Sequence, residues 1–129
     1  MPDEEERVSD NLIVDKSYRF SLKIIELYRF LTEEKWEYIL SKQLLRCGTS
    51  IGANIHEAQA AVSKRDFVSK ISIASKEARE TFYWLRLMRD SGFIDEETAL
   101  GKELFNEIES IMKITTKIVK TGQENASNR

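Results

Sequence analysis

Apolar side chains recur at helical spacing in four stretches of the chain, so the pattern predicts four α-helices. Positions three or four apart share one face of a helix. The expected helices cover residues 10–31, 33–61, 64–91 and 96–121. The second stretch has the clearest apolar stripe, which consists of Leu40, Leu44, Cys47, Ile51, Ile55 and Ala58.

Residues that favour helix starts precede three of these stretches. Thr32 is the expected N-cap of the second helix, because the two glutamates after it would lie at the positive end of the helix dipole. Ser63 is the expected N-cap of the third helix, with Asp66 completing a capping box. Asp95 is the expected N-cap of the fourth.

Two glycines and short connections complete the predicted architecture. Gly92 and Gly122 should end the third and fourth helices. Connections of about two to five residues between long helices favour antiparallel neighbours. We therefore predict an all-α, antiparallel up-down-up-down four-helix bundle over residues 10–122, between a disordered acidic N-terminus (1–9) and a flexible tail (123–129).

Composition narrows the class of protein. One proline and five glycines in 129 residues argue against a β fold with many turns. A single cysteine excludes an internal disulfide and fits the reducing cytoplasm. The absence of a long apolar run argues against a membrane span. The net charge of −2 lacks the positive excess of a dedicated nucleic-acid binder, so such a role needs a local basic patch.

The third helix carries more apolar side chains than one core stripe needs. Phe67, Ile71, Ala74, Ala78, Leu85 and Met88 share the expected core face. Other large apolar side chains fall outside the core stripes of the second and third helices, and a contiguous aromatic set of this kind marks an interface. We therefore expect a homo-oligomer, with these interface candidates: Trp36, Ile73, Tyr83, Trp84 and Leu87.

Polar residues follow one edge of the second helix and meet a matching pair on the third. Arg46, Ser50, Asn54 and Glu57 recur at helical spacing, and the third helix offers Glu77 and Glu80. We interpret these residues as a structural polar network. The alternative is a catalytic pocket that uses the carboxylates, but no nucleophile with an adjacent base accompanies them.

Metal and cofactor chemistry has little support in the sequence. His56 is the only histidine and lacks a ligand-type residue three positions away, so the Glu-x-x-His pattern of di-iron bundles is missing. Cys47 falls on a core stripe, where a buried, inert thiol is expected. We predict no metal and no cofactor.

One basic stripe remains as a candidate for nucleic-acid binding. It consists of Arg65, Lys76, Arg79 and Arg86, which fall on one side of the third helix. The alternative is an ordinary solvated helix face whose cations pair with neighbouring acids.

Two segments resemble a known family. SIGANIHEA at residues 50–58 and ISIASKEARETFYWLRLM at residues 71–88 resemble the four helix bundle protein family, also called the ribosomal-RNA intervening-sequence protein or S23-like family. Its relatives include the accessory variability protein of retroelements, a basic pentamer that binds nucleic acid and a reverse transcriptase. The resemblance implies a homopentameric ring without enzymatic activity. It also implies a structural role for the matching signature residues: Arg46, Ser50, Asn54, Glu57 and Glu80.

The sequence thus predicts a non-catalytic, cytoplasmic, homo-oligomeric scaffold whose partners are copies of itself and RNA, DNA or another protein. The alternative is an enzyme that uses Glu57, Glu77 and Glu80.

Overall fold

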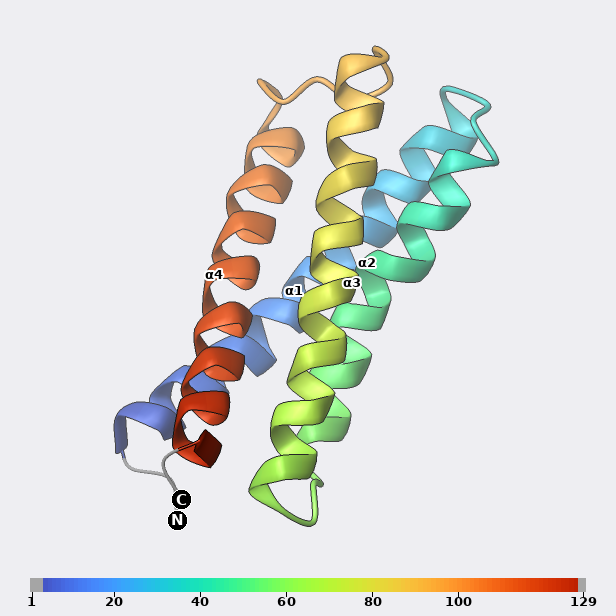
Figure 1. Cartoon of the computed structure of the whole chain (residues 1–129). Helices are drawn as coiled ribbons and strands as arrows, with labels where there is room; N and C mark the ends of the chain where they lie inside the picture. The colour runs from blue at the N-terminus through green and yellow to red at the C-terminus, as the bar shows by residue number, and fades with distance from the viewer. Residues whose placement is uncertain (1–3, 128–129) are drawn as a thin grey trace.

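The computed structural model contains four α-helices and, within residues 4–127, no strand, which confirms the all-α class (Figure 1). The backbone is described for residues 4–127 and the side chains for residues 11–125. No helix in this part of the chain has the length and apolar character needed to cross a membrane. The helices are α1 (Glu4–Glu33), α2 (Leu40–Ala58), α3 (Lys64–Asp90) and α4 (Ala99–Ser127).

Each helix packs against the next one in the chain, and α4 packs back against α1. In Figure 1 the start of α1, the end of α4 and the α2–α3 connection lie at the lower end, whereas the α1–α2 and α3–α4 connections lie at the upper end. The four pairs of neighbouring helices therefore form four outer faces around one core.

The core consists of one apolar stripe from each helix. Phe20 and Ile24 of α1 and Ile108 of α4 are fully buried in it. Burial of each such side chain stabilises the fold by about 1.5–3 kcal/mol. The α3 stripe is confirmed, because Phe67 is partly buried and these members are completely buried: Ile71, Ala74, Ala78, Leu85 and Met88.

Helix α1 is longer than predicted at both ends. It begins at Glu4, so residues 4–9 are helical and not disordered, while residues 1–3 lie outside the described part. Glu and Arg, which are common in this segment, are strong helix formers. The helix also includes Thr32, whose hydroxyl donates a hydrogen bond to the Tyr28 carbonyl at 2.9 Å. The prediction that Thr32 caps the next helix is therefore wrong.

Helix α2 begins at Leu40, seven residues later than predicted, because Glu37 supplies its N-terminal cap. The Glu37 carboxylate accepts backbone N–H hydrogen bonds from Ile39 (3.1 Å), Leu40 (3.0 Å) and Ser41 (2.7 Å). Partial burial opposes ionisation of Glu37, but these hydrogen bonds outweigh it and lower the pKa of the carboxyl.

The start of α3 agrees with the prediction. The Ser63 hydroxyl accepts a hydrogen bond from the Asp66 N–H at 3.0 Å, and the Asp66 carboxylate accepts one from the Val62 N–H at 3.3 Å. Gly92 takes the left-handed conformation expected after α3, with φ of 89°.

Both predicted boundaries of α4 are wrong. The helix begins at Ala99, and the Thr98 hydroxyl accepts the Gly101 N–H at 3.0 Å, while Asp95 caps only the preceding turn. At the other end α4 passes through Gly122 and continues to Ser127. A Cβ at Gly122 would lie 2.5 Å from a Val68 methyl, so this glycine permits close packing on α3. Residues 128–129 lie outside the described part.

Candidate functional site

A charged cluster joins α2 to α3 near the middle of the bundle. The Arg46 guanidinium on α2 pairs with Glu80 of α3, and its Nη1 lies 3.5 Å from Oε2 of Glu77. The indole N–H of Trp84 donates a hydrogen bond to the same Glu80 carboxylate at 3.1 Å. The structure thus brings together the cation and the two α3 carboxylates that the sequence placed in one network.

This cluster has one cation for two carboxylates. The Glu77 side chain is only 22% exposed, and its Oε2 is buried without a hydrogen-bond donor in the described part of the chain. The guanidinium at 3.5 Å therefore compensates that charge electrostatically. A half-buried carboxylate that lost this partner would be costly. The geometry suits a clamp that holds α2 and α3 in register.

The other three signature residues do not join the cluster. The Asn54 amide donates to the Ser50 carbonyl at 2.8 Å, one turn away on α2. Glu57 is exposed and has no polar side-chain partner among the described residues. It lies eleven residues after Arg46, about 16 Å along the helix axis. Glu57 and the Glu77–Glu80 pair are therefore too far apart to act on one bond.

Cys47 and His56 show no arrangement that would support chemistry. The Cys47 thiol is buried, and desolvation is the main reason that its pKa rises to about 11. His56 is exposed on α2. Within the described residues, no three His, Cys, Asp or Glu side chains are grouped so that they could hold a metal ion.

Large apolar side chains lie on the outside of the α2–α3 face. Trp36 is 75% exposed and takes a left-handed conformation (φ 52°), which costs a non-glycine residue roughly 1–2 kcal/mol. Tyr83 is 57% exposed, and its ring meets the partly buried Trp84 edge to face at 5.2 Å. We call this set the α2–α3 apolar surface; it consists of Trp36, Tyr38, Ile39, Ile73, Tyr83, Trp84 and Leu87.

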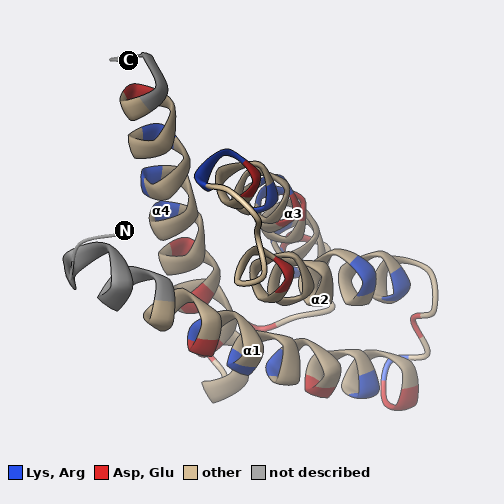
Figure 2. Ribbon diagram, turned by 90° about the horizontal axis from the view of Figure 1, so that it is seen from below, with Lys and Arg blue, Asp and Glu red and all other residues tan. Residues whose placement is uncertain are grey.

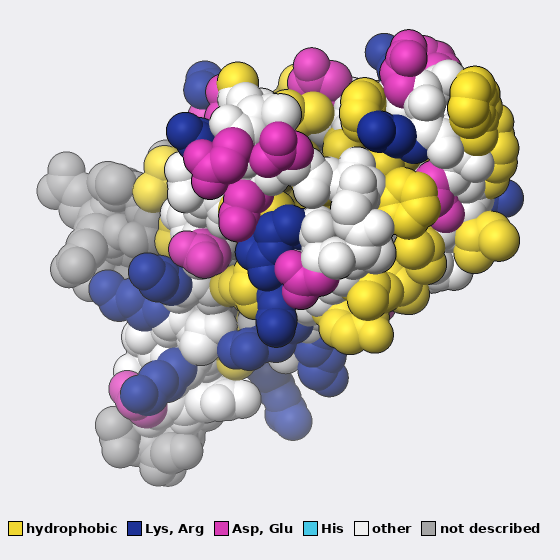
Figure 3. Space-filling view, turned by 90° about the horizontal axis from the view of Figure 1, so that it is seen from above, with side chains coloured by type: hydrophobic (Ala, Val, Ile, Leu, Met, Phe, Trp, Pro, Cys, Tyr) yellow, Lys and Arg dark blue, Asp and Glu magenta, His cyan; other side chains and the backbone are white. Residues whose placement is uncertain are grey.

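This surface continues across both helices. Ile39 lies two turns from Arg46 and Leu87 lies two turns from Glu80, so both lie toward the same end of the ion pair. Figure 3 shows hydrophobic side chains gathered from the α1–α2 connection, at the right, toward the C-terminal half of α3. Ile73, Tyr83, Trp84 and Leu87 therefore lie on α3, and the exposed Trp36 lies in the α1–α2 connection, at the same end of the bundle as Leu87.

The outer side of α3 and α4 is basic. Lys113, Lys117 and Lys120 recur at helical spacing on α4 and are exposed. Arg79 reaches α4 from α3 and donates a hydrogen bond to the Thr116 hydroxyl at 3.3 Å. We call this set the α3–α4 basic surface; it consists of Arg79, Arg86, Lys113, Lys117 and Lys120.

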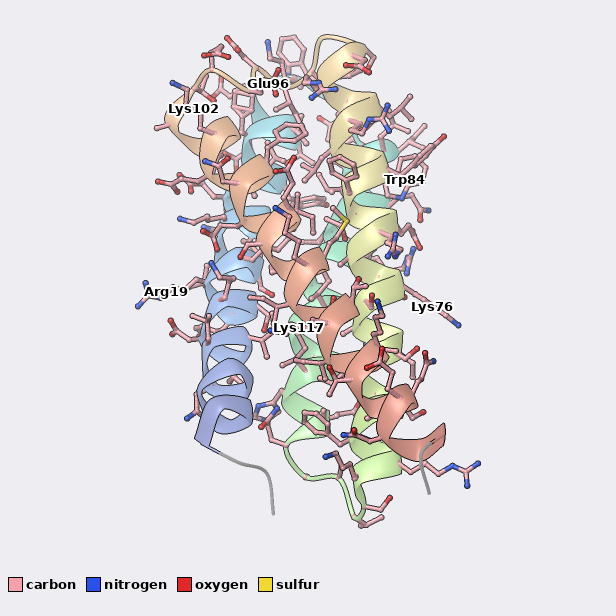
Figure 4. The ribbon with its side chains drawn as sticks, turned by 60° about the vertical axis from the view of Figure 1, so that its left-hand side comes forward. Arg19, Lys76, Trp84, Glu96, Lys102 and Lys117 are labelled. Carbon is pink, nitrogen blue, oxygen red and sulfur yellow. The ribbon has the colours of Figure 1, made fainter. Side chains whose placement is uncertain are left out.

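The structure divides the predicted basic stripe and extends it. Figure 2 shows basic positions along α4 and at the near end of α3. Figure 4 shows Lys76 and Trp84 on the side of α3 that faces away from α4. Arg65 lies in the first turn of α3. None of the five cations of the α3–α4 basic surface forms an ion pair within the described residues. The helical spacing of Lys113, Lys117 and Lys120 indicates the contribution of α4, which the stripe predicted from α3 did not include.

The α1–α4 face carries separate ion pairs, and at the upper end of the bundle Arg89 pairs with Asp90 at 2.9 Å and with Glu96 at 3.2 Å. Lys16 pairs with Glu107 at 2.8 Å and Lys23 with Glu103 at 2.5 Å, as on a solvent-facing surface. At the upper end, a cleft of about 700 Å³ opens between α1 and the α3–α4 connection, whose Glu96 is labelled in Figure 4. The carboxylates proposed for the enzyme alternative do not line this cleft.

Comparisons with known proteins agree with the fold and the signature. The family model described as 23S rRNA-intervening sequence protein matches residues 9–117. A crystal structure of a protein of unknown function from the S23 ribosomal protein family of Bacteroides thetaiotaomicron is 46% identical in sequence, with a TM-score of 0.81. The match covers 87% of this chain and 98% of that one. No curated protein matches the chain. The matched residues contain both signature segments and all four helix cores, and the chain belongs to the 23S rRNA-intervening sequence protein family.

Proposed function

We propose that this protein is a non-catalytic, cytoplasmic scaffold that assembles into a homopentameric ring of antiparallel, up-down-up-down four-helix bundles. The α2–α3 apolar surface carries this proposal. Most of its side chains lie toward one end of the Arg46–Glu80 ion pair, and four of the seven are aromatic, a residue class that is enriched in protein–protein interfaces.

The magnitude of the exposed apolar surface favours association. Full burial of a large apolar side chain is worth about 1.5–3 kcal/mol. Seven such side chains, already partly covered, would contribute on the order of 10 kcal/mol when another molecule covers them. Association costs an estimated 4–15 kcal/mol in lost motion. The gain from burial is therefore of the same size as this cost.

Native mass spectrometry and analytical ultracentrifugation test the assembly directly. We expect a mass five times that of the 15.0 kDa chain. Tyr83→Asp should reduce the mass, because it places a charge in the apolar surface. Asn106→Asp, which adds the same charge at an exposed position of α4, is the matched control. A wild-type monomer at tens of micromolar would end the proposal.

The α3–α4 basic surface favours a second role for the same scaffold, namely binding of RNA or DNA through the phosphate backbone. Five cations that form no ion pair within the described residues gather there on a chain whose net charge is −2. Repetition around a ring would strengthen weak contacts by avidity. Binding that depends on phosphate contacts must weaken steeply as salt rises.

Fluorescence anisotropy with labelled single-stranded RNA and duplex DNA across a salt series tests this role. Lys117→Glu should weaken binding and reduce the dependence on salt. Arg19→Glu, which reverses an exposed charge on α1, should change neither (both residues are labelled in Figure 4). If wild-type protein binds neither nucleic acid at low salt, this role is excluded and a protein remains as the scaffold's partner.

Two observations support the non-catalytic part of the proposal against the enzyme alternative. Arg46 pairs with both α3 carboxylates, and Glu57 lies far from them along α2. Glu80→Gln should lower stability or assembly, whereas Glu57→Gln should leave both unchanged. An intact Glu80→Gln oligomer with unaltered stability would contradict the structural role of Glu80, and loss of a turnover in that intact oligomer would favour the enzyme alternative.

A further inference from the structure

A second exposed apolar stripe lies on α1, on a different face from the first. Tyr18 is 66% exposed and Leu22 is 52% exposed, and Ile25 is partly exposed. They follow the helical spacing of four and three residues, so they form one continuous stripe.

Contacts of neighbouring residues show which face carries the stripe. Ser21 lies against α2, because a Cβ at Gly52 would be 3.1 Å from its hydroxyl. Tyr18 and Ile25 are three and four positions from Ser21, so they lie on its side of α1. The residues that pair with α4, such as Lys16, lie on the other side. The stripe therefore borders α2.

Helix α2 extends this surface. Gly48 faces α1, since a Cβ there would lie 2.9 Å from Ile24, and the partly buried Leu45 lies one turn before it. We call this set the α1–α2 apolar surface; it consists of Tyr18, Leu22, Ile25 and Leu45.

We infer that the α1–α2 apolar surface of one copy packs against the α2–α3 apolar surface of the next copy around the ring. This inference rests on the proposed self-association and specifies its contact. The two remaining faces are poor candidates for the contact between copies, because the α3–α4 face is basic and the α1–α4 face carries ion pairs.

The presence of two unlike apolar surfaces favours a heterologous contact. An isologous dimer uses one self-complementary surface and would leave the other uncovered. A heterologous contact covers both on every copy and produces a ring if the rotation closes. The two surfaces lie on neighbouring faces that share α2, not on opposite faces. Successive copies would therefore turn about the assembly axis and close, whereas opposite faces would favour a straight filament.

Charge at the edges of the two surfaces is complementary. On the α2–α3 face the exposed Glu57 carboxylate has no side-chain partner within the described residues, whereas Arg46 pairs with Glu77 and Glu80.

The α1–α2 face is bordered by two exposed cations. Arg29 lies one turn after Ile25, and Lys42 lies about one turn before Leu45. Neither forms an ion pair within the described residues. Opposite charges at the borders of two apolar surfaces fix the orientation of a contact.

The faces are large enough for a stable contact. With 19 residues, α2 is about 28 Å long, and two helices side by side are about 20 Å wide. The projected area is thus on the order of 560 Å². Two such faces would together bury on the order of 1,100 Å², which is above the roughly 1,000 Å² expected of a biological interface.

A mixing experiment with two variants tests the pairing. Leu22→Asp disrupts the α1–α2 surface, and Leu87→Asp disrupts the α2–α3 surface. Both side chains are exposed, at 52% and 38%, and circular dichroism verifies that each variant is folded. Leu12→Asp is the matched control, because Leu12 is 49% exposed on α1 but lies one turn before Lys16, on the α4 side.

Each variant alone should be monomeric, whereas Leu12→Asp should keep the wild-type mass. An equimolar mixture of Leu22→Asp and Leu87→Asp should form a one-to-one dimer, because one copy retains the α2–α3 surface and the other retains the α1–α2 surface. If Leu22→Asp unfolds, Tyr18→Asp replaces it in the same design.

Two results would overturn the inference while the proposed oligomer stands. One is a Leu22→Asp variant, and likewise Tyr18→Asp, with the wild-type mass. The other is a mixture that stays monomeric although each variant alone has lost assembly. A monomeric wild type would instead reject the oligomer and the pairing together.

Discussion

Arg46 offers the sharpest test of how α2 and α3 are held together. Arg46→Met keeps much of the aliphatic length of the side chain and removes only the guanidinium. The change leaves Glu77, which is 22% exposed, and Glu80, which is 37% exposed, without their cation. Trp84 continues to donate one hydrogen bond to Glu80. The removal of the guanidinium therefore destabilises the Glu77 carboxylate more than the Glu80 carboxylate.

The expected decrease in the free energy of unfolding of Arg46→Met lies between two limits. Exposed ion pairs contribute about 0–1 kcal/mol, whereas breaking a buried pair costs about 3–5 kcal/mol. The Arg46 side chain is 51% exposed but Oε2 of Glu77 is buried, so we expect a loss of about 1–3 kcal/mol. For a domain of this size the melting temperature should fall by about 4–12 °C.

A double-mutant cycle measures the interaction itself. Urea unfolding at one fixed protein concentration compares wild type, Arg46→Met, Glu77→Gln and the double variant, since assembly adds to apparent stability. The double variant should be more stable than the sum of the single losses predicts, because the neutral amide that Glu77→Gln introduces does not need a cation. A loss below 0.5 kcal/mol for Arg46→Met, or strictly additive losses, would show that the pair does not hold the two helices together.

Three further predictions concern the cap, the helix contact and the thiol. Glu37→Ala should destabilise the fold by about 0.5–2 kcal/mol by removing the α2 cap. Because the folded pKa of Glu37 is lowered, its contribution is complete above the ordinary value of 4.5 and is lost as pH falls through the folded pKa; melts from pH 7 to pH 3 should therefore fall less steeply for the variant. Gly48→Ala should lower stability in urea by about 1–2 kcal/mol, because its Cβ would lie 2.9 Å from the buried Ile24, and a more stable variant would contradict the close contact. The Cys47 thiol, with a pKa of about 11, should react with a disulfide reagent at pH 8 only as fast as the protein unfolds, and rapid reaction of the native protein would show that the thiol is accessible.

Local signals in the sequence were sufficient where the structure depends on local contacts. Ser63 and Asp66 cap α3 as predicted, because both capping hydrogen bonds join residues within four positions of each other. Gly92 takes positive φ for the same local reason. The pairing of Arg46 with Glu77 and Glu80 of α3 was also predicted, because opposite charges that are half-buried on adjacent helices tend to pair.

Other local signals failed for two different reasons. Gly122 resembles a helix stop, but Val68 of the distant α3 packs against it and the helix continues. Thr32 resembles an N-cap, but Glu37, five residues later, accepts three backbone hydrogen bonds and α2 begins at Leu40. The outcome at Gly122 depends on a distant contact, whereas the outcome at Thr32 depends on which of two nearby residues caps the helix.

The amino-acid pattern was enough to establish four helices, their core stripes and an excess of apolar side chains on α3, because the helical repeat depends on backbone geometry common to every residue. Which helix edges face outward depends on the neighbours that cover them. For that reason the exposed stripe at Tyr18 and Leu22 and the joining of Lys117 with Arg79 on one surface became visible only after α1 had packed beside α2 and α4 beside α3.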